Sequence, residues 1–449
     1  MQIVQNRRLI FSPLRSQRIP AIARKIFLML VILVGLPSLF CIALNVNTLW
    51  LHYGVSAAYL LTCGCIIAES LTATRSLQEP SVPTTVPRVT FIVVAYLPNE
   101  QDLILQTLGH ILNRVRKPDA PWELILAYNS PTRLPINEQL NQLAASHPNF
   151  RQLWVKGSHS KAENLNAAVR TARGDMICLL DADHWPDVDC VAQAWRWLSN
   201  GYDVVQGRCV VRNHSSGIIS RLVSIEFEAI YGLFHHARSV IAQTAIFGGS
   251  NAYWRADALR RMHFNRDRLT EDIDVSVRAV ARGIRFIHDR TIVSTEMAPA
   301  SFKALFTQRK RWAQGWLEVT LLHQLRLWRS RHLTLWQKLY WTYTLSYREV
   351  FTILSLQVYT ALLTQLLLDI QITPTSRLFL WVTSAVCLAT GIIHTLFIQR
   401  YQAQRYPLAN YVLYVGLHWL FVTWKGLVSL IAWYDHVTRK RDWVVTPRQ

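Results

Sequence analysis

Long apolar segments near both ends of the chain constrain its fold most strongly. Two come early, at Ile26–Leu44 and Trp50–Ala68, and three come late, at Val350–Leu368, Leu378–Ile398 and Tyr411–Trp433. A helix needs about 20 apolar residues to cross the hydrocarbon core of a bilayer. Hydrophobic residues make up 51% of the chain, which includes 17 tryptophans. Part of the chain must therefore lie in lipid, and we expect helices that span a membrane.

Positive charge lies beside these apolar segments. The chain has a formal charge of +20 and no recognisable nucleic-acid-binding motif, so anionic lipid head groups are the expected partner and nucleic acid is not. A signal peptide is the alternative interpretation of the first segment, but a long basic region precedes it and a second apolar segment follows at once. Basic residues beside a membrane segment are typical of its cytoplasmic side, and we refer to this tendency as the charge rule. We predict a multi-pass protein of the inner (plasma) membrane, with a basic cytoplasmic N-terminus at residues 1–25 and two transmembrane helices at 26–69.

The last apolar segment is difficult to orient. A single crossing would leave the basic run 439–441 outside, against the charge rule. Lys425 and Gly426 interrupt the segment near its middle, so a re-entrant hairpin or two short helices is the alternative. The ending at residues 442–448 resembles the Trp-x-x-Thr-x-Arg close common in membrane-embedded polysaccharide synthases, and this resemblance implies a cytoplasmic C-terminus. We assign residues 346–435 to a C-terminal transmembrane region and 436–449 to a basic C-terminal tail.

Between the apolar segments, short β-rich runs alternate with amphipathic helices. This alternation is typical of an α/β domain with a mostly parallel sheet. We expect a linker at residues 70–87, a cytoplasmic domain at 88–298 and interfacial amphipathic helices at 299–345. The predicted strands are Val89–Tyr96, Glu123–Ala127, Gln152–Lys156, Met176–Leu180 and Val204–Arg208. Ligands bind at the carboxyl ends of strands in open sheets of this kind, so the residues that follow these strands are candidates for a site.

Three motifs between residues 181 and 312 suggest chemistry. Asp181-Ala182-Asp183 follows a buried strand, and two such carboxylates can hold Mg²⁺ or Mn²⁺ together with phosphate oxygens. Thr270-Glu271-Asp272 comes with Asp274 in an acidic cluster, which is also typical of a plain helix N-terminus. Gln308-Arg309-Lys310-Arg311-Trp312 lies in a predicted amphipathic helix at Pro299–Leu321, for which a basic helix on a membrane surface is the alternative.

In this order, and followed by apolar segments, the motifs resemble those of the membrane-embedded inverting glycosyltransferases of family 2. That group includes cellulose, hyaluronan, chitin and poly-N-acetylglucosamine synthases and some glycolipid-forming relatives. The resemblance covers residues 88–320 closely and the membrane segments only in layout. It implies a GT-A-like α/β nucleotide-sugar-binding domain with a mixed, mostly parallel sheet, inserted between transmembrane helices. It also implies a UDP-sugar-dependent hexosyltransferase that requires Mg²⁺ or Mn²⁺.

For the donor, the resemblance implies that Asp183 ligates the metal ion, with Asp181 assisting at metal or nucleotide. Lys161 opens a segment similar to the family's Lys-Ala-x-x-Leu-Asn, near the diphosphate, although a solvated surface lysine is the alternative. Arg311 would contact the same diphosphate.

The nucleotide base is less well defined by the sequence. Glu100 follows the first strand and is a candidate for nucleotide-sugar binding. Asn129 stands where many members have an aspartate that contacts the uracil. An asparagine can still hydrogen-bond a pyrimidine edge through its donor and its acceptor. We therefore keep Asn129 as a candidate contact to the base.

For the acceptor, the resemblance makes Asp272 the general base, which takes the hydroxyl proton as the acceptor attacks the anomeric carbon. The segment that contains Gly249 and Ser250 is similar to a family segment whose small residues let a sugar approach the backbone, and a simple turn is the alternative. Trp312 would stack on the acceptor sugar. The expected acceptor-binding residues are Gly249, Ser250, Glu271, Gln308 and Trp312.

The predicted reaction is the formation of a β-glycosidic bond with inversion. A processive synthase of a β-glycan is the favoured interpretation. Transfer of one sugar to a lipid acceptor such as diacylglycerol is the alternative, and a non-catalytic scaffold is disfavoured because Asp183 and Asp272 are both present. Nothing in the sequence indicates a protein partner.

Two further residue sets are assigned no function. The seven cysteines are scattered and odd in number, which argues against a disulfide framework or a zinc site. His235 and His236 are adjacent on a predicted helix and point two ways, so we expect them on the surface and not as metal ligands.

Overall fold

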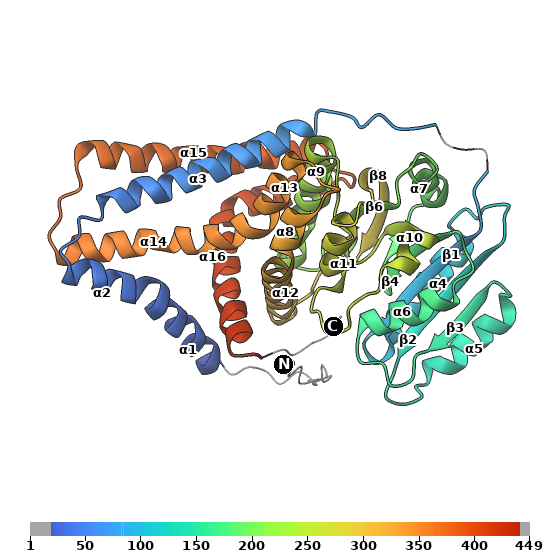
Figure 1. Cartoon of the computed structure of the whole chain (residues 1–449). Coiled ribbons are helices and arrows are strands. Elements are labelled where there is room, and N and C mark those ends of the chain that lie inside the picture. The colour runs from blue at the N-terminus through green and yellow to red at the C-terminus, as the bar shows by residue number, and fades with distance from the viewer. Residues whose placement is uncertain (1–18, 82, 84, 441–449) are drawn as a thin grey trace.

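The computed structural model of the protein describes residues 19–81, 83 and 85–440 (Figure 1). An α/β domain lies at one end, and a group of long helices extends away from it. Most of the predicted basic N-terminus, residues 1–18, lies outside the described residues, as does the tail from residue 441 onward.

An eight-stranded mixed sheet forms the α/β domain, with the strand order β3-β2-β1-β4-β7-β6-β8-β5. The pairs β1–β2, β1–β4, β2–β3 and β6–β8 are parallel, whereas β7 is antiparallel to β4 and β6, and β5 is antiparallel to β8. The strands are β1 (Val89–Tyr96), β2 (Trp122–Asn129), β3 (Phe150–Trp154), β4 (Met176–Asp181), β5 (Trp185–Pro186), β6 (Val204–Val211), β7 (Ala252–Arg255) and β8 (Phe286–Glu296).

All five strands that the sequence predicts are present. β1 has the predicted bounds, β2, β4 and β6 are longer than predicted, and β3 begins and ends two residues earlier. The apolar runs marked these strands because both faces of the sheet are covered. Phe91 and Val93 of β1 face one buried cluster, and Ile92 and Val94 face the other. A strand buried on both faces is apolar throughout, which makes it visible in the sequence.

Helices cover both faces of the sheet. Those of the α/β domain are α4 (Leu97–Asn113), α5 (Ile136–Ser146), α6 (Lys161–Thr171), α7 (Cys190–Leu198), α8 (Ile218–Phe227), the π-helix η2 (Glu228–Phe234), α9 (His235–Ala242), α10 (Ala256–Arg261) and α11 (Glu271–Val280). The remaining helices are α1 (Ile19–Leu30), η1 (Val31–Gly35), α2 (Leu36–Ala43), α3 (Leu49–Thr72), α12 (Phe302–Arg329), α13 (Leu335–Thr342), η3 (Tyr343–Tyr347), α14 (Arg348–Leu367), α15 (Pro374–Arg400) and α16 (Leu408–Val437).

Within the described residues, five helical segments are long and apolar enough to cross a membrane. They are Pro20–Ala43, Leu49–Thr72, Leu335–Leu367, Pro374–Arg400 and Leu408–Val437. Each overlaps one of the apolar segments found in the sequence. The third begins well before the predicted segment because α13, η3 and α14 follow one another without a break, so the boundary placed after residue 345 falls within a helix.

The last apolar segment forms one unbroken helix, α16. Lys425 and Gly426 lie inside it, so this part of the structure contains neither a hairpin nor two short helices. Figure 1 shows that α16 runs across the direction shared by α3, α14 and α15. It packs against α12, α8 and α1, and its start also contacts α15. The fifth apolar segment is thus oriented differently from the second, third and fourth.

The predicted surface positions of His235 and His236 are wrong, because both side chains are buried. His235 stacks on Tyr231, and His236 Nε2 lies 2.8 Å from the carbonyl oxygen of Arg75. The two histidines do point in different directions, as adjacent helical residues must. Both directions lead into protein because α9 lies between the sheet and α3, which it contacts along with β8.

Candidate active site

A cleft of about 180 Å³ lies where the carboxyl ends of β1, β2 and β4 meet α11 and α12. The structure brings every site residue proposed from the sequence to this one cleft. Those residues are Glu100, Asn129, Lys161, Asp181, Asp183, Gly249, Ser250, Glu271, Asp272, Gln308, Arg311 and Trp312. They come from separate elements between β1 and α12. The order of the strands in the sheet and the packing of α12 bring them together.

Lys161, at the first turn of α6, connects the two halves of the cleft. Its Nζ lies 2.5 Å from Asp181 Oδ1 and 4.0 Å from Glu271 Oε1, and it donates a hydrogen bond of 2.8 Å to the carbonyl oxygen of Gly249. Burial lowers the pKa of Lys161, but the surrounding carboxylates outweigh burial and raise it above its usual value. Lys161 is therefore a fixed positive charge in the cleft, and not a solvated surface lysine.

Asp181 and Asp183 stand at the end of β4, as the sequence predicts. The backbone N–H of Asp181 donates to Ser250 Oγ over 2.9 Å, which ties the end of β4 to the segment around Gly249. Asp183 is 2% exposed, and its Oδ2 accepts a hydrogen bond of 3.1 Å from the Met297 N–H. The two carboxylates are hard oxygen donors at the edge of a cleft. That donor set fits Mg²⁺ or Mn²⁺ when diphosphate oxygens complete the coordination.

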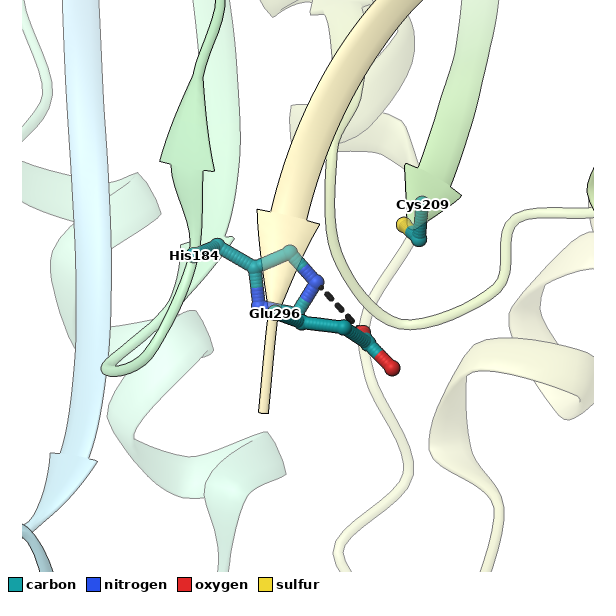
Figure 2. A group of neighbouring side chains, drawn as sticks. All are labelled: His184, Cys209 and Glu296. Carbon is teal, nitrogen blue, oxygen red and sulfur yellow. Dashed lines mark ion pairs between the residues drawn. The ribbon is translucent and has the colours of Figure 1, made fainter. Parts of the chain in front are cut away.

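A second group of potential ligands lies directly beyond Asp183. Figure 2 shows His184, Cys209 and Glu296, whose donor atoms lie within 4.8 Å of one another. His184 Nε2 is 2.8 Å from Glu296 Oε2, and its Nδ1 is 3.3 Å from Asp183 Oδ1. Burial lowers the pKa of His184, but its contacts with Asp183, Cys209 and Glu296 raise it well above its usual value. His184 thus connects the carboxylates of Asp183 and Glu296, so this group supports the position of Asp183.

Glu271 and Asp272 form a carboxylate pair at the N-terminus of α11. Burial and the charge of Asp272 raise the pKa of Glu271 to about 7. Burial also raises the pKa of Asp272, against the opposing effect of Lys161 and of the Ile273 N–H, which donates to Asp272 Oδ1 over 2.9 Å. Raised pKa values suit carboxylates that must accept a proton near neutral pH.

Asp274 belongs to the same acidic cluster in the sequence but not to the cleft. Its carboxylate is 2.7 Å from Arg278 Nε and 2.8 Å from His323 Nε2 of α12. Asp274 therefore attaches α12 to α11, whereas Glu271 and Asp272 face the cleft. The sequence could not separate these roles because helical neighbours differ only in the face they occupy.

Glu100 and Asn129 line the cleft near the ends of β1 and β2. Glu100 is buried and accepts a hydrogen bond of 3.0 Å from Asn99 Nδ2. Asn129 Nδ2 donates to the Ser158 carbonyl oxygen over 3.1 Å, and its Oδ1 accepts from Asn164 Nδ2 over 2.8 Å. The Asn129 amide is thus held in a fixed orientation by the protein.

Helix α12 brings Gln308, Arg311 and Trp312 to the opposite wall. Ser301 caps this helix by accepting a hydrogen bond from the Ala304 N–H, so the helix begins three residues later than predicted and continues to Arg329. Arg311 Nη1 donates to the Leu269 carbonyl oxygen over 3.2 Å, next to the Glu271–Asp272 pair. The Trp312 ring lies against Phe227, with 6.5 Å between the ring centroids.

Several cleft residues were not predicted from the sequence. They include His184, Glu296, Met297, Phe227 and Tyr231. His184 follows Asp183 directly, and Glu296 ends β8, so both obey the rule that sites form where strands end. Tyr231 lies in the π-helix η2, a feature that is frequent at functional sites but has no sequence signal of its own.

A family model described as "Glycosyl transferase family group 2" matches residues 176–434. This range covers more than half of the chain and includes the three motifs between Asp181 and Trp312 and most of the C-terminal helical region. The chain belongs to this glycosyltransferase family, and its apolar helices identify it as a membrane protein.

Two relatives illustrate the similarity. The chain is 25% identical to poly-beta-1,6-N-acetyl-D-glucosamine synthase of Staphylococcus epidermidis over 250 residues, which are 55% of this chain and 59% of that protein. It is 31% identical to glucomannan 4-beta-mannosyltransferase 7 of Arabidopsis thaliana over 176 residues, 38% of this chain and 31% of that protein. The matched region thus spans less than two thirds of either relative.

The fold is similar to that of a solved enzyme. The mannosyltransferase PcManGT from Pyrobaculum calidifontis, in complex with GDP-Man and Mn²⁺, has a TM-score of 0.55 and 22% sequence identity, with 88% of this chain and 99% of that chain covered. The predicted GT-A-like fold is confirmed.

Gly249 gives a direct test of the cleft geometry. Its φ is +90°, and a Cβ at this position would lie 2.8 Å from Asp272 Oδ2. We expect Gly249→Ala to lower glycosyl transfer by about 100-fold, because small displacements of reacting groups have effects of this size. The left-handed backbone should reduce stability by only about 1–2 kcal/mol. Initial transfer rates and thermal unfolding of the detergent-purified variant measure the two effects, and Gly217→Ala, at an open helix start, is the control. Unchanged transfer by Gly249→Ala would contradict this geometry.

Proposed function

We propose that the protein transfers a hexose from a UDP-sugar to an acceptor hydroxyl with inversion, forming a β-glycosidic bond. The observation that carries this proposal is the arrangement around Lys161. The lysine joins Asp181, on the proposed donor side, to the Glu271–Asp272 pair, on the proposed acceptor side. Family membership supports the reaction class, and the choice of sugar nucleotide belongs to the proposal.

In the proposed reaction, Asp272 acts as the general base. The acceptor oxygen forms a bond to the anomeric carbon, the bond from that carbon to the diphosphate breaks, and the hydroxyl proton passes to Asp272. Lys161 and Arg311 lie in the same cleft and offset the negative charge on the leaving nucleoside diphosphate. The raised pKa of Asp272 makes it a stronger base than an exposed aspartate.

A divalent cation, Mg²⁺ or Mn²⁺, is the proposed cofactor. Asp183 would hold it, with Asp181 assisting, and the ion would supply positive charge to the diphosphate oxygens. The protein prepares Asp183 for this task through the Met297 N–H and the His184–Glu296 pair. The presence of Mn²⁺ with GDP-Man in PcManGT is consistent with a metal-dependent reaction on this fold.

The favoured product is a β-linked polysaccharide. The relatives named as a poly-beta-1,6-N-acetyl-D-glucosamine synthase and a glucomannan mannosyltransferase support this choice. Transfer to a lipid such as diacylglycerol uses the same residues and differs only in the acceptor, so the assay must separate the two products.

The first experiment is an assay of purified protein with Mg²⁺ or Mn²⁺ and radiolabelled UDP-glucose, UDP-N-acetylglucosamine, UDP-galactose and GDP-mannose. Label in insoluble polymer would support the polysaccharide synthase, and label in an organic phase would indicate glycolipid synthesis. Asp272→Asn should lower either product by about 10²–10⁴-fold, the usual contribution of a general base. Transfer from GDP-mannose alone would overturn the proposed UDP donor, and undiminished transfer by Asp272→Asn would overturn the proposed base.

The pH dependence tests the carboxylate pair. Only deprotonated Asp272 can accept a proton, and burial raises its pKa, so we expect the transfer rate to fall as the pH drops towards this raised pKa. Glu271→Gln removes a neighbouring negative charge, lowers the pKa of Asp272 and should move this fall to lower pH. Rates between pH 5 and 9 measure the effect. The same midpoint in the variant and the wild type would show that the two carboxylates are not coupled.

We further propose that the catalytic domain is cytoplasmic and that α16 lies along the cytoplasmic face of the membrane without crossing it. The connections α2–α3 and α14–α15 lie at the end of the helical group away from the α/β domain (Figure 1). The connection α15–α16 and the end of α16 lie nearer the domain. This arrangement keeps Arg439 and Lys440 on the cytoplasmic side, as the charge rule requires.

Labelling of cysteines introduced one at a time tests this topology. Gln371→Cys, Ala403→Cys and Thr438→Cys lie in exposed segments before α15, before α16 and after α16. In intact cells, a membrane-impermeant maleimide should label only Gln371→Cys, and the other two should react after permeabilisation. The parent protein, whose described cysteines are all free, gives the background. Labelling of positions 403 and 438 from opposite sides would show that α16 crosses.

A further inference from the structure

Helix α16 contributes a lysine to a buried charge cluster beside the cleft. Lys425 Nζ lies 2.9 Å from Glu226 Oε1 of α8, and Arg309 Nη2 of α12 lies 2.5 Å from Glu226 Oε2. Glu226 and Arg309 are almost fully buried, and the Lys425 side chain is 35% exposed. Three helices that are distant in sequence are thus joined at a single carboxylate.

Arg309 carries this cluster to the wall of the cleft. Its guanidinium carbon lies 4.4 Å from the centroid of the Trp312 ring and 6.0 Å from that of Phe227. Trp312 and Phe227 both line the cleft, whereas Arg309 does not. A planar guanidinium stacked on an indole restricts the orientation of both groups. Glu226 and Lys425 therefore act on Trp312, the residue proposed to hold the acceptor, through the position of Arg309.

Stability alone does not explain such a cluster. Burying charges has a large desolvation penalty, and apolar replacements of buried ion pairs are often as stable or more so. Burial raises the pKa of Glu226, but Arg309 and Lys425 outweigh burial and lower it, so the carboxylate stays charged. A need to hold the neighbouring Trp312 ring in a fixed position accounts for these charges better than a contribution to stability does.

A second cluster on the same helices provides an internal comparison. Asp435 of α16 lies 2.6 Å from Lys25 Nζ of α1 and 2.5 Å from Lys310 Nζ of α12. It also joins α16 to α12, but its Lys25 lies over the ring of Tyr434, which does not line the cleft, whereas Arg309 stacks on a cleft residue. A comparison of variants in the two clusters can therefore distinguish a general loosening of α16 from a specific effect on the cleft.

We propose that Glu226, Arg309 and Lys425 are positioning residues that fix the Trp312 ring for the acceptor, so that α16 controls acceptor binding from outside the cleft. This inference rests on the proposed function. It assigns a role to Lys425, the residue that made the last apolar segment difficult to interpret.

The test compares Lys425→Met, Lys425→Arg, Glu226→Gln and Asp435→Asn with the wild type. The donor is the sugar nucleotide that the wild type uses, and the probe acceptor is a soluble β-linked disaccharide of that sugar or, for label in the organic phase, diacylglycerol. Two rates are measured: transfer over a range of acceptor concentrations, and donor hydrolysis by water without acceptor. Thermal unfolding in detergent measures stability.

We expect Lys425→Met and Glu226→Gln to raise the acceptor KM by about tenfold, the scale of a displaced binding group. The donor KM and donor hydrolysis should stay within about twofold of the wild type, because none of the contacts that the described residues make with this cluster involves a donor-side residue. Lys425→Arg keeps the charge and should restore the acceptor KM. Asp435→Asn should lower stability without changing the ratio of transfer to hydrolysis.

Two results would overturn the inference. An unchanged acceptor KM in folded Lys425→Met and Glu226→Gln would show that the cluster does not act on Trp312. An equal rise in Asp435→Asn would show that any loosening of α16 has the same effect. Failure of the proposed function is distinguishable, because the wild type itself would then transfer no label to any acceptor.

Discussion

The packing of α12 between α11 and α16 is the contact on which the rest of the structure depends. Gly315 makes it possible, because a Cβ at this position would collide with the Thr270 side chain directly before the Glu271–Asp272 pair. On its other side, α12 packs along α16. One helix therefore sets the distance between the carboxylates of the α/β domain and the arginine and tryptophan that face them, and links both to the membrane part of the protein.

Charge organises the interior of this assembly. Lys161 lies among Asp181, Glu271 and Asp272, so the cleft places a fixed cation beside the Glu271–Asp272 pair, whose pKa values are raised. Further out, Glu226 and Asp435 each join α12 to α16 through basic side chains. Buried ions act over several ångströms because the surroundings screen them weakly. The chemistry proposed for the cleft and the attachment of the surrounding helices thus rest on the same type of interaction.

Much of the fold could be predicted because burial leaves a local pattern. Strands covered on both faces are continuous apolar runs, and all five predicted strands are present. β7 was missed because four residues, Ala252–Arg255, are too few to show a period, and β8 was missed although it is longer. The direction of α16 could not be predicted, since composition records how apolar a helix is and not how it is oriented. His235 and His236 were misplaced because their burial depends on α3, more than 150 residues away in sequence.

The sequence by itself determined the class of protein and the residues to consider, since motifs at the ends of strands and helices bring particular side chains to predictable edges. Only the tertiary structure decided that Asp274 turns away from the cleft, that His184 and Glu296 support Asp183, and that Lys425 is paired with Glu226. The physical reason is that periodicity and spacing describe interactions between neighbours along the chain. Ion pairs between distant helices arise from packing, which no local pattern encodes.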